Sequence, residues 1–184
     1  SEGFPSVFQD SRKLIATDSH VGNANVDSRK TNENLKNWKL ENQIYVVTGF
    51  IAKDKNDETT TLGRGGSDYT AAILGSGLKA DEIQIWTDVD GFLTADPRLV
   101  KNAFSQSELS YQEAMEMSYF GAKVIYPPTM IPAIESQIPI YIKNTFKPES
   151  QGTLIHQKSE ISKVLSKELF LSRKPASLIL LEMG

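Results

Sequence analysis

Short runs of apolar and β-branched residues alternate along this chain with segments of helical composition, and this alternation constrains the fold more than any other feature. Residues 44–50 (IYVVTGF) form an apolar run of strand length, and residues 82–87 (EIQIWT) and 138–143 (IPIYIK) are typical of further strands. Helical segments lie between them, at 67–78 and after a Ser-x-x-Glu capping box at 110–113. Strands that alternate with helices predict an α/β fold with a mainly parallel sheet.

Weaker local patterns predict the remaining elements. Turn residues, β-branched residues and helix-capping residues mark their bounds. They indicate short strands at 7–8 and 14–16, a loop at 17–26, a helix from Asp27 to about Leu40, a polar excursion at 51–61, a helix from the capping box to Gly121, a short helix at 129–136, and strands at 152–155 and 177–182.

Composition narrows the function classes. The 184 residues suit one domain, and the absence of cysteine excludes disulfides and cysteine-ligated metals. A net charge of −3 argues against a general nucleic-acid binder. No apolar run approaches the ~20 residues of a membrane helix, and the N-terminus lacks the basic start and apolar core of a secretory signal. We therefore expect a cytoplasmic protein that binds neither nucleic acid nor membrane.

The densest local motif is TTTLGRGGSD, at residues 59–68. Its glycines permit unusual backbone angles, and the helix that follows offers free N–H groups to an anion. Arg64 can hold a carboxylate or phosphate through two parallel hydrogen bonds, and Asp68 adds a carboxylate beside it. An ordinary glycine loop capped by Ser67 is the simpler interpretation. Arg64 inside the loop favours an anion site.

A second motif, WTDVDGFLTADPR at residues 86–98, follows a predicted strand. Ligands of open α/β sheets bind at the carboxyl ends of strands. Thr87 and Asp88 could therefore contact a base or ribose, and Arg98 could contact phosphates. A plain strand–turn–loop explains the same residues equally well.

The third motif is FGAKV, at residues 120–124. Lys123 suits either a phosphate contact or the end of a helix. The chain contains no Gly-x-x-x-x-Gly-Lys-[Ser/Thr] motif, which excludes a P-loop. The glycine-rich run at 75–80 follows a helix and precedes a strand, the reverse of a dinucleotide-binding motif.

Together these motifs resemble the catalytic domain of the aspartokinases, within the amino-acid-kinase family. The resemblance extends over roughly residues 10–155. It rests on GFIAKDKNDETTTLGRGGSDYTAA, EIQIWTDVDGFLTADPRLV, LSYQEAMEMSYFGAKVIYPPTMIPA, and IPIYIKNTF followed by GTLI. It implies an amino-acid-kinase-like three-layer sandwich. The implied reaction is phosphorylation of the L-aspartate β-carboxylate by ATP with Mg²⁺, giving 4-phospho-L-aspartate, the first step towards lysine, threonine and methionine.

The same resemblance assigns roles to individual residues. Asp68 corresponds to a catalytic acid that orders the cation beside the phosphates, and no protein residue is assigned as a metal ligand. The aspartate pocket comprises Phe50, Arg64, Gly65, Gly66 and Ser67. The nucleotide site comprises Thr87, Asp88, Leu93, Arg98, Lys123 and Val124, although Leu93 stands where the family often has Tyr or Val.

Aspartokinases also carry an early Lys-Phe-Gly-Gly-Thr-Ser loop, which this sequence lacks. We therefore expect an N-terminally truncated internal fragment that is inactive alone. The expected parts are a partial catalytic domain at 1–158, a linker at 159–176 and the start of a regulatory ACT strand at 177–184. The expected assembly is a homodimer or higher homo-oligomer, because truncation would expose apolar strand edges. Fusion of the parent to homoserine dehydrogenase stays open.

Two other functions stay open from the residues alone. The chain could be a non-catalytic regulatory module that binds an amino acid or a nucleotide. It could also belong to an amino-acid kinase that phosphorylates a different carboxylate. A pure amino-acid sensor needs no nucleotide site, so titration with ATP and then aspartate separates the first alternative from a kinase.

Overall fold

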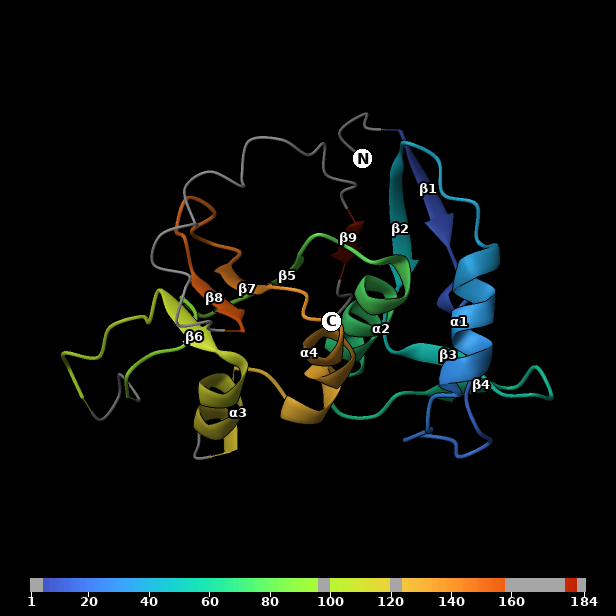
Figure 1. Cartoon of the computed structure of the whole chain (residues 1–184), viewed down its shortest axis with the longest axis horizontal. Coiled ribbons are helices and arrows are strands. Elements are labelled where there is room, and N and C mark those ends of the chain that lie inside the picture. The colour runs from blue at the N-terminus through green and yellow to red at the C-terminus, as the bar shows by residue number, and fades with distance from the viewer. Residues whose placement is uncertain (1–4, 96–99, 120–123, 158–177, 182–184) are drawn as a thin grey trace. The chain divides into compact units, whose positions relative to one another are not determined.

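A computed structural model describes residues 5–95, 100–119, 124–157 and 178–181 (Figure 1). The chain divides into two compact units. The first unit comprises residues 1–80 and 176–184, and the second comprises residues 81–175. Each unit contains its own sheet, and together the sheets confirm an α/β fold with mainly parallel strand pairing.

The first unit is built on a three-stranded parallel sheet with the order β1-β2-β9. The central strand β2 (Ile44–Thr48) pairs with β1 (Ser6–Gln9) and with β9 (Leu178–Leu181). β1 and β2 lie side by side in Figure 1. The predicted strands at 44–50 and 177–182 are therefore confirmed. β2 ends before Phe50, because that residue has a left-handed backbone with φ 70°.

Residues 51–61 are not a polar excursion, so that expectation is wrong. β3 (Ile51–Lys53) and β4 (Thr59–Thr61) form an antiparallel hairpin instead. Thr60 is buried, and its hydroxyl lies 2.6 Å from the hydroxyl of Thr17. A strand of three residues is too short to show an alternation of apolar and polar residues. β3 and β4 are ordered instead by pairing with each other.

Residues 14–16 also differ from the prediction, since they form no strand. A short 3₁₀ helix spans Ser11–Lys13, and Ala16 makes only a single bridge to Lys53. Leu14 and Ile15 are nonetheless buried. The apolar signal at this position therefore reflected burial in the core rather than strand geometry.

Two helices complete the first unit. The Asp27 side chain caps α1 (Ser28–Asn37) by accepting a hydrogen bond from the Lys30 N–H, as predicted, and the helix ends three residues before Leu40. The predicted helix at 67–78 is confirmed as α2 (Gly66–Leu78). It begins after the left-handed Gly65, with no side-chain cap, so Ser67 does not cap it.

The first unit buries one hydrophobic core between its helices and strands. Trp38 packs edge-on against Tyr45, with ring centroids 5.0 Å apart. Gly77 lets the helices approach closely, because a Cβ there would lie 2.2 Å from Leu35 Cδ1. The buried core residues are Leu14, Ile15, Leu35, Tyr45, Val47, Ala52, Leu62, Ile73 and Leu74.

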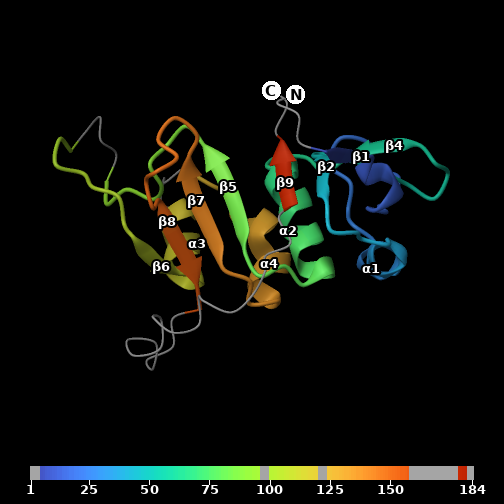
Figure 2. The same cartoon turned by 90° about the horizontal axis from the view of Figure 1, so that it is seen from above.

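The second unit contains a four-stranded sheet with the order β5-β7-β8-β6 (Figure 2). β5 (Ile83–Thr87) and β7 (Ile140–Asn144) are parallel, as are β6 (Glu108–Ser110) and β8 (Thr153–His156). β7 and β8 pair antiparallel. The strands predicted at 82–87, 138–143 and 152–155 are thus confirmed, and β6 is an addition.

The helices of the second unit follow the predicted capping signals. At the start of α3 (Tyr111–Tyr119), Glu113 Oε2 accepts from the Ser110 N–H at 2.7 Å, and Ser110 Oγ accepts from the Glu113 N–H at 3.1 Å. The capping box is therefore confirmed, while the expected end at Gly121 lies outside the described residues. A 3₁₀ turn at Pro127–Met130 leads into α4 (Ile131–Glu135), where a short helix was predicted.

Among the described residues, we find no helix with the length and apolar character needed to cross a membrane.

Candidate functional site

The glycine loop, defined here as residues 63–66, joins β4 to α2 in the first unit. Gly63 and Gly65 adopt left-handed backbones with φ 74° and 66°, which most side chains disfavour. Arg64 between them is exposed, and Asp68 lies half-buried in the first turn of α2. The loop thus places Arg64 two residues before the first residue of a 13-residue helix, whose N-terminal dipole favours an anion.

Phe50 lies directly against this loop. A Cβ at Gly66 would come within 2.5 Å of Phe50 Cδ2, and a Cβ at Gly49 would lie 3.3 Å from Ser67 Oγ. The end of β2 and the start of α2 are therefore in contact. The structure brings together the five residues predicted for the aspartate pocket, which are Phe50, Arg64, Gly65, Gly66 and Ser67, and Asp68, the predicted catalytic acid, follows them in α2.

The loop at 17–26 supports the glycine loop from the other side. Its Ala24 N–H donates to the Thr61 carbonyl at 2.9 Å. The Asn23 side chain lies against the Gly63 backbone, since a Cβ on Gly63 would be 2.2 Å from Asn23 Oδ1. The sequence indicated a loop here, but nothing in it connected these residues to Arg64.

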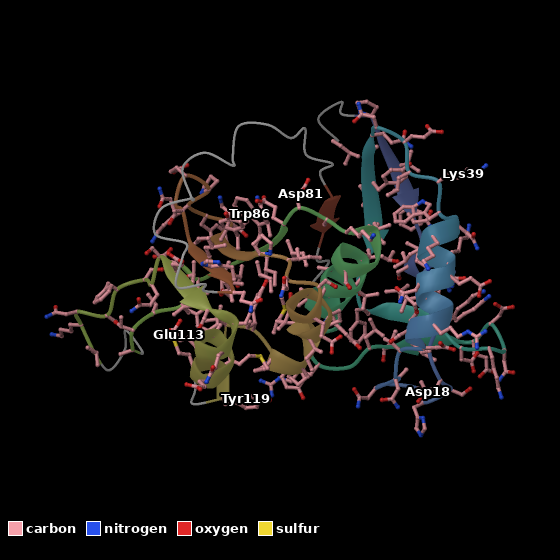
Figure 3. The ribbon with its side chains drawn as sticks, in the orientation of Figure 1. Asp18, Lys39, Asp81, Trp86, Glu113 and Tyr119 are labelled. Atoms are coloured by element: carbon pink, nitrogen blue, oxygen red, sulfur yellow. The ribbon has the colours of Figure 1, made fainter. Side chains whose placement is uncertain are left out.

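Asp18 organises that supporting loop (Figure 3). Its carboxylate accepts from the Asn25 side chain at 2.6 Å, and also from the backbone N–H groups of His20 and Asn25. These hydrogen bonds, led by the Asn25 side chain, lower the pKa of Asp18 to about 2.

The low pKa of Asp18 predicts a specific acid response. Because the folded pKa lies below the unfolded value of about 3.9, the stabilising contribution is complete above pH 4 and is lost as the pH falls towards 2. Carboxyl-carbon NMR should give a titration midpoint near 2. Asn25→Ala should raise it, whereas Asn56→Ala, which removes a donor to Asp54, should not. A native midpoint near 4 would contradict this hydrogen-bond assignment.

In the second unit, Thr87 ends β5 and Asp88 follows it. The Thr87 hydroxyl donates to Asp88 Oδ1 at 3.2 Å, and the Thr87 carbonyl accepts from the Thr145 N–H at 2.8 Å. Both side chains are at least partly exposed. The expected position at the carboxyl end of a parallel strand is therefore confirmed, and this is where α/β sheets bind ligands.

A buried asparagine, which the sequence did not single out, holds the turn after β5. Asn144 Nδ2 donates to Asp90 Oδ1 at 2.5 Å, and Lys147 Nζ donates to Asp90 Oδ2 at 2.8 Å. Lys147 and Asn144, in that order, lower the pKa of Asp90. A polar residue ending the apolar run of β7 was the available signal.

The loop that continues from this turn carries Leu93, which is half-buried and forms an isolated antiparallel β-bridge with Ser105. The loop is anchored by Thr153, whose hydroxyl accepts from the Phe92 N–H at 2.8 Å and donates to the Gln106 carbonyl at 2.6 Å. Gly91 is required beside it, because a Cβ there would lie 2.3 Å from Thr153 Oγ1. Asp88 and Leu93 thus lie in the anchored loop that follows Thr87 at the end of β5.

The remaining residues predicted for the nucleotide site are Arg98, Lys123 and Val124. Arg98 and Lys123 lie outside the described residues. Val124 is described and half-buried. Within the described ranges, we find no cluster of three acidic, histidine or cysteine side chains that could hold a metal ion.

Comparison with known proteins identifies the family. Residues 1–144 match the Amino acid kinase family. The chain is 46% identical over 156 residues to a maize bifunctional aspartokinase/homoserine dehydrogenase 2, chloroplastic. It is 42% identical over 154 residues to the lysine-sensitive aspartokinase 3 of Escherichia coli. These matches include 83% and 82% of this chain, but only 17% and 34% of the relatives.

A solved structure agrees with the sequence comparison. The crystal structure of E. coli aspartokinase III in complex with aspartate and ADP superposes with a TM-score of 0.79 at 40% identity. The superposition includes 86% of this chain and 36% of that one. The predicted amino-acid-kinase fold is therefore confirmed, and the chain belongs to the amino acid kinase family.

Proposed function

We propose that this chain supplies the aspartate-binding and nucleotide-binding segments of an aspartokinase. In the proposed reaction, a β-carboxylate oxygen of L-aspartate attacks the γ-phosphorus of ATP, the bond to the β-phosphate oxygen breaks, and 4-phospho-L-aspartate and ADP result. This reaction begins the route to lysine, threonine and methionine. The observation that carries the proposal is Arg64 in a glycine loop at the start of α2, packed against Phe50, in a chain 46% identical to one bifunctional aspartokinase and 40% identical to the aspartokinase whose structure superposes on it.

The chemistry suits the residues present. An aspartate carboxylate with a pKa of about 3.9 is ionised at neutral pH, so the nucleophile needs no general base. The barrier lies in bringing two anions together, which positioning and positive charge can overcome. Arg64 and the N–H groups of the glycine loop would bind and orient the acceptor. Thr87, Asp88, Leu93, Arg98, Lys123 and Val124 would hold the nucleotide.

Mg²⁺ fits this arrangement as a companion of the nucleotide. It is commonly held by one or two carboxylates together with phosphate oxygens. The absence of a three-ligand cluster among the described residues is compatible with that mode. Asp68 would order the cation, which would neutralise phosphate charge when bound.

The decisive experiment places this chain inside a complete relative. Because the chain spans 34% of the E. coli aspartokinase 3 length, we would replace the matched 154 residues of that enzyme with the corresponding residues of this chain. This protein is called the chimera below. ATP-dependent formation of aspartyl hydroxamate is the expected result. A folded chimera, with a cooperative unfolding transition but no product from aspartate, would overturn the proposal.

The same chimera separates the alternatives. Product from glutamate or acetylglutamate in place of aspartate would indicate a kinase for another carboxylate. Binding of aspartate or ATP to a folded but inactive chimera would indicate a regulatory module. The homo-oligomeric state and the cytoplasmic location stay predictions, and several plant relatives are named chloroplastic.

A further inference from the structure

One buried threonine hydroxyl connects the two segments that form the proposed aspartate pocket. Thr70 lies in α2 and is 0% exposed. Its Oγ1 accepts a hydrogen bond from the Phe50 N–H at 3.0 Å and donates one to the Gly66 carbonyl at 2.8 Å. The same oxygen therefore ties the turn after β2 to the first residue of α2.

The turn at Phe50 needs such a restraint. A left-handed backbone is uncommon for a bulky L residue, so the surroundings must hold it. On the strand side, the Phe50 carbonyl accepts from the Leu62 N–H at 2.9 Å. On the helix side, the Phe50 N–H donates to Thr70 Oγ1.

The position of the Phe50 ring depends on this geometry. Phe50 is 41% exposed, and its ring lies against Gly66, which has no side chain to block it. If the Phe50 N–H lost its acceptor, the turn could relax and the ring could leave the glycine loop. The wall of the pocket would then move relative to Arg64.

We propose that Thr70 is a positioning residue of the aspartate site, which acts through Phe50 and Gly66 and need not touch a substrate. This inference rests on the proposed function for its kinetic consequence. Its structural part, the restraint on the Phe50 turn, stands on the two hydrogen bonds alone.

The test compares two substitutions at the same site. Thr70→Val keeps the shape of the side chain but removes both hydrogen bonds, whereas Thr70→Ser keeps the hydroxyl. In the chimera, Thr70→Val should raise the KM for aspartate about tenfold and leave the KM for ATP within about twofold. Thr70→Ser should restore the KM for aspartate to near the parent value.

Thr31 offers a matched control in the same unit. It is also a buried helical threonine, and its hydroxyl accepts from the Ala16 N–H at 3.1 Å rather than from the Phe50 turn. Thr31→Val should reduce stability without changing the KM for aspartate. Equal effects of Thr31→Val and Thr70→Val on that KM would overturn the proposal, because they would indicate a general loss of stability.

Hydrogen exchange provides a second readout in the 184-residue chain itself. Thr70→Val should accelerate exchange of the Phe50 amide about tenfold or more, and Thr70→Ser and Thr31→Val should not. Unchanged Phe50 exchange in Thr70→Val would reject the restraint. A parent chimera without product would refute the proposed function instead, and the exchange result would still decide the role of Thr70.

Discussion

Arg64→Ala in the chimera is expected to raise the KM for aspartate about 100-fold while the KM for ATP stays within about twofold. Arg64 is exposed in the glycine loop, between two glycines with left-handed backbones. Removing a guanidinium that pairs with a bound carboxylate through two hydrogen bonds costs about 2–5 kcal/mol of binding free energy. A 100-fold change in KM corresponds to about 2.7 kcal/mol.

Two variants make the Arg64 result specific. Arg64→Lys keeps the charge but loses the planar fork, so we expect a KM for aspartate between those of the parent and the alanine variant. Arg29→Ala removes an exposed charge from α1 and should change neither KM. Equal losses for aspartate and ATP in Arg64→Ala would reassign the side chain to the phosphates.

Gly152→Ala is expected to lower the free energy of unfolding of the second unit by about 3 kcal/mol or more. Gly152 has φ 67°, and a Cβ there would lie 1.9 Å from the carbonyl oxygen of Ile142. That carbonyl belongs to β7, which pairs with strands on both sides, so it cannot move aside without disturbing the sheet. Backbone strain at the positive φ and steric overlap of the new Cβ therefore both destabilise the Gly152→Ala variant.

Each unit contains one tryptophan, which allows the measurement to be localised. Trp86 projects from β5 (Figure 3), so its fluorescence in a Trp38→Phe background reports on the second unit during urea unfolding. Gly22→Ala in the first unit, followed through Trp38 in a Trp86→Phe background, is the control for backbone strain, since Gly22 has φ 99° but nothing within 4 Å of a Cβ. A cost for Gly152→Ala no larger than that of Gly22→Ala would contradict the steric argument.

The sequence predicted the elements whose signals are local. The capping box at Ser110 and the Asp27 cap depend on side chains within one helical turn, and both formed as expected. The run in β2 was long and β-branched enough to be recognised. The hairpin of β3 and β4 was missed because each strand has only three residues, and cross-strand pairing rather than local preference orders them.

The candidate site was predictable to the same extent. The residues of the glycine loop are contiguous, so their motif was visible in the sequence. Thr70 and Thr153 act through tertiary hydrogen bonds, and no local pattern distinguishes them from ordinary threonines, whereas Asn144 was marked only by its polarity at the end of β7. The left-handed backbone of Phe50 was likewise invisible, because it depends on a helix twenty residues further along the chain.

The division of the chain into two units has an evolutionary consequence. Hydrogen bonds within the first unit hold the glycine loop that carries Arg64. Hydrogen bonds within the second unit hold the segment that carries Thr87 and Asp88. On the proposed assignment of the two sites, mutations that alter the choice of phosphoryl acceptor can accumulate in the first unit while the donor preference of the second unit is inherited unchanged. A lineage of such enzymes would then change the carboxylate that it phosphorylates and still use the same nucleotide as phosphoryl donor.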